Sequence, residues 1–100
     1  MNREQYLLCK LAEECAELGK DAIKAAIFGM DDLWEDLPSS KDRILQEFSE
    51  IHAVMEMIFL PETAVKLDYK TIGNKIKKVE KYMEYSRERD RLNDTRREGD

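Results

Sequence analysis

Three stretches of the chain carry apolar residues at helical spacing, and none shows the alternation of a strand. The first stretch runs from about Asn2 or Arg3 to Phe28. Its apolar residues fall on one helical face: Leu7, Leu8, Leu11, Cys15, Leu18, Ala22 and Ala25. Gly29 follows directly, in the position where a glycine commonly ends a helix. The pattern predicts one long amphipathic helix at the start of the chain.

A second apolar stripe predicts a helix over about residues 41–60. Its members are Ile44, Phe48, Ile51, Met55 and Ile58. Ser39 or Ser40 can cap the start of this helix, and Pro61 stops it. The segment before it, residues 30–40, carries a proline and two serines and is therefore predicted to be a loop.

The third stripe predicts an amphipathic helix that starts after a cap at Asp68 or Thr71. Its members are Ile72, Ile76, Val79 and Met83. Beyond Tyr85 the apolar pattern nearly ends, so we expect residues 91–100 to form a polar, mobile tail on a domain of residues 1–90. Together the three stretches predict an all-α fold, an antiparallel bundle of three main helices.

The composition favours a small cytoplasmic subunit that works as an oligomer. A chain of 100 residues with 39% charged residues suits thin helices whose core is completed in a homodimer or homotetramer. The net charge of −5 disfavours nucleic acid as a partner, because binding to its backbone needs clustered Lys and Arg. We expect no membrane partner either, since no apolar run approaches the roughly 18 residues of a membrane span and the N-terminus lacks a signal-peptide pattern. Cys9 and Cys15 lie about 240° apart around one predicted helix, so they cannot pair, which fits a reducing compartment.

Two of the predicted helices carry a Glu-x-x-Glu pair near the face that must be buried. At about 100° per residue, Glu14 lies on the leucine side of the first helix, and Glu17 flanks it. On the second helix, Glu47 falls inside the apolar arc and Glu50 lies at its edge. Facing pairs from two helices would gather four carboxylates around one point.

Four partly buried carboxylates repel one another and would mostly take up protons unless a cation joined them. Oxygen-only ligands favour Mg²⁺, with Mn²⁺ as a substitute, so the pattern indicates a hard-cation site. Two alternatives stay open: Glu14 and Glu47 pair with Lys or Arg from other helices, or they reach outward to water. A di-iron site wants Glu-x-x-His twice, and the one histidine, His52, lies near the opposite edge of its helix from Glu47. We expect His52 to be a polar surface or interface residue.

Two segments of the chain resemble the MazG-like nucleoside triphosphate pyrophosphohydrolases, in particular their short phage and bacterial members. The segments are LLCKLAEECAELGKDAIKAAIFG and ILQEFSEIHAVMEMI. The family pattern is EExxE on one helix and ExxD on the next. The chain matches the first as EECAE at residues 13–17 and the second as EFSE at residues 47–50, where Glu50 replaces the family's Asp. The third helix, KKVEKYMEYSRER, is similar to the end of these proteins, so the resemblance covers about residues 5–90.

This resemblance implies a Mg²⁺-dependent hydrolase that cuts a nucleoside triphosphate between the α and β phosphates, releasing the monophosphate and pyrophosphate. We expect a deoxynucleotide substrate, and the family implies a helical dimer or tetramer with sites completed between subunits. The implied metal ligands and catalytic residues are Glu14, Glu17, Glu47 and Glu50. Glu13 matches the family's first Glu but points away from the apolar stripe, which suggests a supporting salt bridge. Glu50 adds one methylene, which can shift the metal or weaken the activity.

Five further residues are candidates for holding the substrate. Lys24 matches a lysine that the family carries before its FG turn, and Lys75, Lys78 and Tyr82 lie along one flank of the third stripe. These four are candidate phosphate ligands. The alternative is that their side chains lie on the surface and are solvated. Trp34, the only tryptophan, either stacks on the base or pins its loop to the core.

A non-catalytic interpretation also stays open. In it the chain is a helical oligomer that acts as a nucleotide- or protein-binding module, with its acidic face recognising basic side chains. The inward positions of Glu14 and Glu47 favour the enzyme, because a docking surface has no need for carboxylates inside apolar arcs.

Overall fold

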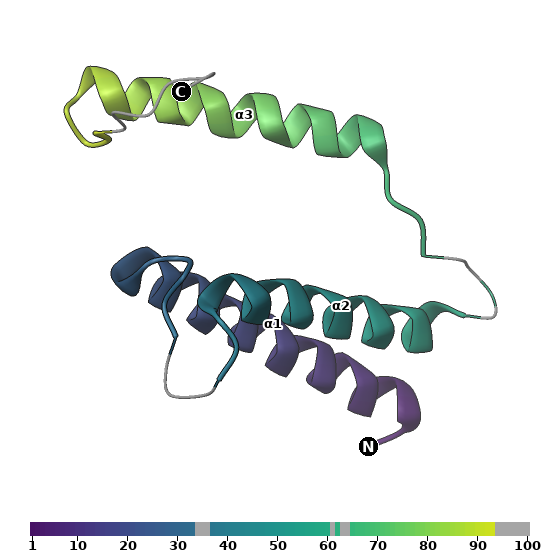
Figure 1. Ribbon diagram of the computed structural model, residues 1–100. Helices are drawn as coiled ribbons and strands as arrows, with labels where there is room; N and C mark the ends of the chain where they lie inside the picture. Colours follow the sequence, from purple (N-terminus) through teal and green to yellow (C-terminus); the bar gives the residue numbers. More distant parts are fainter. Residues whose placement is uncertain (34–36, 61, 63–64, 94–100) are drawn as a thin grey trace. The chain divides into compact units, whose positions relative to one another are not determined.

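The computed structural model consists of three α-helices (Figure 1). They are α1 (Arg3–Phe28), α2 (Ser40–Phe59) and α3 (Tyr69–Glu88). The structure describes residues 1–33, 37–60, 62 and 65–93, and it contains no strand within them. The all-α fold predicted from the three apolar stripes is therefore confirmed.

Local hydrogen bonds set the ends of α1 and the start of α2. The Asn2 side chain accepts a hydrogen bond from the backbone N–H of Gln5 (2.8 Å), and the Gln5 side chain accepts one from the backbone N–H of Asn2 (2.9 Å). This reciprocal pair satisfies two N–H groups that the first turn leaves free. Gly29 ends α1 with φ = 100°, which few other residues adopt, as predicted. Ser39, one of the two expected caps, accepts from the N–H of Asp42 at 3.2 Å and starts α2.

Helices α1 and α2 pack side by side as an antiparallel hairpin (Figure 1). At the open end, the Arg3 guanidinium donates to the carbonyl oxygen of Met57 at 3.3 Å, joining the start of α1 to the end of α2. At the closed end, the backbone N–H of Ser40 donates to the carbonyl of Asp32 at 3.1 Å. Both ends of the hairpin are thus tied, so residues in the middle of α1 face residues in the middle of α2.

The core of this hairpin is thin. Leu7 and Ala25 are the only buried apolar residues in the described part of the chain, at 5% and 7% exposure. Many larger apolar side chains of the same two helices are exposed: Leu8, Ile23, Ile27, Leu45, Phe48 and Met57. A two-helix layer has one packed seam, so most of its apolar surface stays accessible.

The chain divides into two compact units, residues 1–65 and 66–100, and each is described by itself. In the second unit, the Asp68 side chain accepts hydrogen bonds from the backbone N–H groups of Lys70 and Thr71, both at 3.1 Å. Asp68, one of the two predicted caps, therefore starts α3. The Thr71 backbone N–H lowers the pKa of the Asp68 carboxyl, because it stabilises the charged form.

The end of α3 is a turn built on a left-handed residue. Asp90 has φ = 55°, and the backbone N–H of Arg91 reaches back to the carbonyl of Ser86 at 2.8 Å. This is the geometry by which helices commonly satisfy their last carbonyl groups. Most of the predicted polar tail, residues 94–100, lies outside the described residues.

No helix among the described residues is long and apolar enough to cross a membrane. Cys9 and Cys15 are both free, as their positions around α1 predicted, and both are exposed, although Cys15 was expected on the apolar face.

Candidate metal centre

Three of the four predicted carboxylates converge between α1 and α2. Glu14 comes from the middle of α1, and Glu47 and Glu50 lie on α2, three residues apart. One carboxylate oxygen of each lies within 4.8 Å of the other two. Residues three apart share one side of a helix, so the Glu47–Glu50 spacing turns both side chains toward α1. We call these three residues the carboxylate cluster.

Glu47 is the member of the cluster with a buried, unpartnered oxygen. Its Oε2 atom is shielded from solvent and has no hydrogen-bond partner within the described residues. Glu14 raises the pKa of Glu47 most, by accepting a hydrogen bond from the protonated acid, and burial and Glu50 add to this effect. The pKa of Glu47 rises from 4.5 to about 7. Every one of these influences disfavours the charged form, so no positive group among the described residues offsets the charge of ionised Glu47.

A divalent cation fits this arrangement. A buried carboxylate oxygen costs free energy unless a donor or a cation satisfies it, and three carboxylates bring the negative charge that a hard cation needs. Two oxygens bound to one Mg²⁺ lie at most about 4.2 Å apart, because each Mg–O distance is about 2.1 Å. The three carboxylate oxygens lie within 4.8 Å of one another, so their separations are compatible with a shared cation.

Glu50 reaches the cluster although it replaces the shorter aspartate of the family pattern. The Gln46 side chain donates to the Oε1 atom of Glu50 at 3.3 Å, one turn back along α2. This bond helps to orient the longer side chain. The extra methylene therefore does not keep the Glu50 carboxylate away from Glu14 and Glu47.

The other acidic candidates lie outside the cluster. Glu17 is exposed and is not among the three carboxylates that the structure brings together. Glu13 forms an ion pair with Lys10 at 3.2 Å, which is the salt bridge expected from its outward direction. His52 lies 3.8 Å from Glu56 and is half-exposed, so it belongs to a surface pair and not to the cluster.

A hollow of about 280 Å³ adjoins the cluster. Its lining residues are Asp21, Pro38, Arg43, Gln46 and Glu47. Sequence reasoning did not place Arg43 in the site. The spacing could have indicated Arg43, since Arg43 and Glu47 are four residues apart and so lie on one side of α2.

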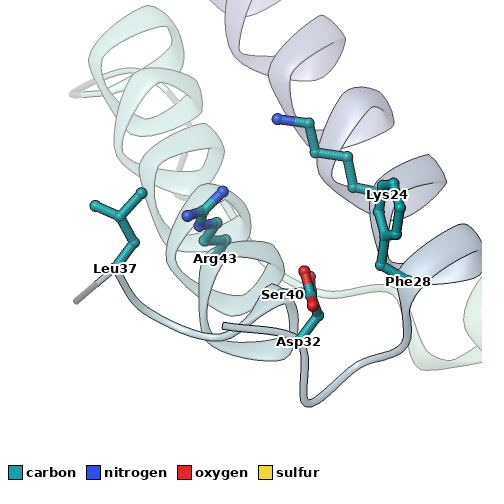
Figure 2. Close-up of a pocket in the computed structure, with 6 residues that line it drawn as sticks. All are labelled: Lys24, Phe28, Asp32, Leu37, Ser40 and Arg43. Atoms are coloured by element: carbon teal, nitrogen blue, oxygen red, sulfur yellow. The ribbon is translucent and has the colours of Figure 1, made fainter. Parts of the chain in front are cut away.

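A second hollow, of about 390 Å³, lies where the end of α1 meets the start of α2 (Figure 2). It is lined by Lys24, Phe28, Asp32, Leu37, Ser40 and Arg43. In Figure 2 the Lys24 side chain extends from α1 toward α2. Arg43 lines this hollow as well as the first one, so the two hollows adjoin at its side chain. The structure thus places Lys24, a predicted phosphate ligand, in a hollow that shares Arg43 with the hollow beside the carboxylate cluster.

The remaining predicted substrate ligands belong to the second unit or lie outside the described residues. Lys75, Lys78 and Tyr82 are exposed residues of α3, in the second unit, and they stay predictions. Tyr82 lines a separate hollow at the end of α3, together with Arg91. Trp34 lies outside the described residues.

Comparison with protein-family models, with curated proteins and with solved structures found no match. The likeness to MazG-like enzymes therefore rests on the two acidic motifs and their spacing.

Proposed function

We propose that the protein is a metal-dependent nucleoside triphosphate pyrophosphohydrolase of the MazG-like type. The observation that carries this proposal is the unpartnered Oε2 atom of Glu47, buried beside two further carboxylates. A surface that binds basic side chains leaves its carboxylates exposed, whereas a cation site needs them turned inward. Mg²⁺ is the expected cofactor, with Mn²⁺ as a substitute.

In this proposal the protein residues hold the cation and accept a proton. Glu14, Glu47 and Glu50 are the ligands that lie together, and Glu17 stands one turn from Glu14. When bound, the cation supplies the positive charge that joins carboxylates to phosphates, and it makes water more acidic. The oxygen of a water molecule bonds to the α-phosphorus, and the bond from that phosphorus to the α–β bridging oxygen breaks. The bond's electrons leave with pyrophosphate, and a carboxylate takes the proton of the water.

The same proposal extends to assembly and location. We infer a homodimer or homotetramer, because the hairpin leaves large apolar side chains such as Ile27 and Phe48 exposed at 67% and 56%. We infer a cytoplasmic protein that acts on deoxynucleoside triphosphates, in agreement with its free thiols and with the family likeness.

The direct test is pyrophosphate release from the common ribo- and deoxynucleoside triphosphates, with Mg²⁺, with Mn²⁺ and with a chelator. We expect metal-dependent formation of monophosphate and pyrophosphate in equal amounts from at least one deoxynucleotide. Glu47→Gln should abolish turnover. Glu56→Gln is the matched control, because Glu56 is an acid of the same helix that pairs with His52 outside the cluster. Release of single phosphate, or no turnover of any nucleotide, would refute the proposal.

A further inference from the structure

Arg43 occupies the boundary between the carboxylate cluster and the larger hollow. It lines the 280 Å³ hollow together with Glu47, and it lines the 390 Å³ hollow together with Lys24 and Phe28. Among the described residues, Arg43 alone lines both hollows. A ligand that occupies both hollows would therefore lie beside Arg43.

The positive charge of Arg43 is not neutralised by the protein around it. Within the described residues its half-buried side chain makes no hydrogen bond and no ion pair, even though Glu47 lies one turn further along α2. On a helix, an ion pair between residues four apart is weaker when the cation precedes the acid in the sequence, as Arg43 precedes Glu47. Five N–H donors in a planar fork thus remain available, and this fork matches the oxygens of a phosphate group.

The backbone at the start of α2 cannot take over this role. The N–H group of Ser40 donates to the Asp32 carbonyl, that of Lys41 to the Met30 carbonyl, and that of Asp42 to the Ser39 hydroxyl. A helix start binds anions through free N–H groups, and here the first three are already used. Binding of an anion in this region therefore depends on side-chain cations, namely Arg43 and Lys24.

The larger hollow also has an apolar wall. Phe28 and Leu37 line it, and the Phe28 ring stands at the end of α1 beside the Lys24 stem (Figure 2). A volume of about 390 Å³ is within the range of sites for small organic ligands. An aromatic side chain next to cations suits a nucleoside with its first phosphate, because the ring can stack on the base.

We propose that Arg43 binds the α-phosphate of the nucleotide and holds it beside the carboxylate cluster, with the nucleoside in the larger hollow against Phe28. This assignment rests on the proposed function, and it names the residue that places the reacting phosphorus. Arg43 then neutralises negative charge on the α-phosphate while water attacks it, and Lys24 adds a second positive charge nearby. Asp32, in the loop at the far side of the hollow from the Lys24 amine, offers an acceptor for a donor group of the nucleoside (Figure 2).

The test compares Arg43→Gln and Arg43→Lys with Lys41→Gln. Lys41 is the matched control, because it is an exposed cation in the same first turn of α2 and lines neither hollow. Two quantities are measured for each variant: binding of deoxynucleoside monophosphates by calorimetry, and kcat and KM for deoxynucleoside triphosphates. Circular dichroism and the Mg²⁺-induced rise in melting temperature report whether the fold and the cation site are intact.

We expect Arg43→Gln to weaken monophosphate binding by about tenfold to a hundredfold, the range for a charge-assisted hydrogen bond. The value of kcat should fall as well, since charge at the α-phosphate grows during the reaction. Arg43→Lys should recover part of both losses, and Lys41→Gln should behave as the wild type. Phe28→Ala should weaken monophosphate binding several-fold while leaving binding of inorganic pyrophosphate unchanged.

The outcomes separate this inference from the proposed function. If the wild type hydrolyses nucleotides and Arg43→Gln keeps its monophosphate affinity and kcat, the role of Arg43 is wrong and the function stands. If the wild type binds monophosphates through Arg43 but releases no pyrophosphate, the binding site stands and the hydrolase proposal fails. If the wild type neither binds nor hydrolyses, both are wrong.

Discussion

Replacing Glu47 with glutamine should stabilise the metal-free protein at neutral and higher pH. The folded protein holds a proton on Glu47 up to about pH 7, whereas the unfolded chain releases it near 4.5. Between these values the folded state binds more protons, so the free energy of unfolding falls as the pH rises. This contribution to stability is complete below pH 4.5 and is lost by the time the pH has passed 7. Glutamine keeps the shape of the side chain and removes the charge, so the variant should lose this pH dependence.

The size of the effect follows from the two pKa values. A gap from 4.5 to about 7 sets an upper limit of about 3–4 kcal/mol, at 1.36 kcal/mol for each pH unit. Glu47 is only partly buried, and water screens its interactions with Glu14 and Glu50, so we expect about 1–2 kcal/mol. For a domain of this length that corresponds to a rise of roughly 5–10 °C in melting temperature at pH 8. At pH 4 the variant and the wild type should melt at nearly the same temperature.

The assay is thermal melting of wild type, Glu47→Gln and Glu56→Gln at fixed protein concentration, from pH 4 to pH 8, with and without metal. Mg²⁺ or Mn²⁺ should raise the melting temperature of the wild type, because it binds the folded site only. At a hundred times its Kd, the cation should add about 2.7 kcal/mol to the free energy of unfolding. The metal response should be blunted in Glu47→Gln and retained in Glu56→Gln. If Glu47→Gln is destabilised without metal while the wild type ignores both cations, Glu47 is the partner of a buried cation and the metal centre is wrong.

Three further results are expected. Sedimentation at micromolar concentration should give a mass of at least twice 11.8 kDa, and a mass near 11.8 kDa would refute the oligomer. Trp34→Ala should raise KM or alter base preference with metal binding intact, whereas unchanged kinetics on every nucleotide would assign Trp34 to packing of its loop. Ser39→Ala removes the acceptor for the Asp42 N–H and should cost about 1 kcal/mol of stability, seen as an earlier midpoint in urea; an unmoved midpoint would mean that water replaces the cap.

The sequence predicts the fold well because the relevant signals are local. Gly29, Ser39 and Asp68 each end or start a helix through hydrogen bonds to residues at most four positions away. Their roles can therefore be predicted without the tertiary structure. The choice between Ser39 and Ser40 as the cap of α2 was not local, since Ser40 donates its N–H to the Asp32 carbonyl across the loop. Helix periodicity also gave the inward direction of Glu14 and Glu47, which depends only on position around the axis.

The site is less predictable because it depends on how two helices are aligned lengthwise. Periodicity places Glu14 inward with Glu17 beside it and predicts both as ligands, but only the antiparallel pairing shows that Glu14 alone of the two meets Glu47 and Glu50. In the same way, Arg43 is an ordinary helix-start residue in the sequence. It becomes part of a site only when the end of α1 is folded back beside it, with Lys24 across the hollow.

Metal binding and folding are therefore expected to be coupled in this protein. The hairpin buries only Leu7 and Ala25 among its described apolar residues, so the margin of stability that its core supplies is small. Because the pKa of Glu47 is raised, its charged form lowers the free energy of unfolding of the metal-free protein by about 1–2 kcal/mol above pH 7. If the proposed cation binds, we expect it to reverse the sign of that contribution, because the carboxylates that repel one another would then be its ligands. The raised pKa thus implies that ionised Glu47 makes the metal-free hairpin less stable above pH 7, and we expect a bound cation to return that stability only when Glu14, Glu47 and Glu50 are correctly aligned.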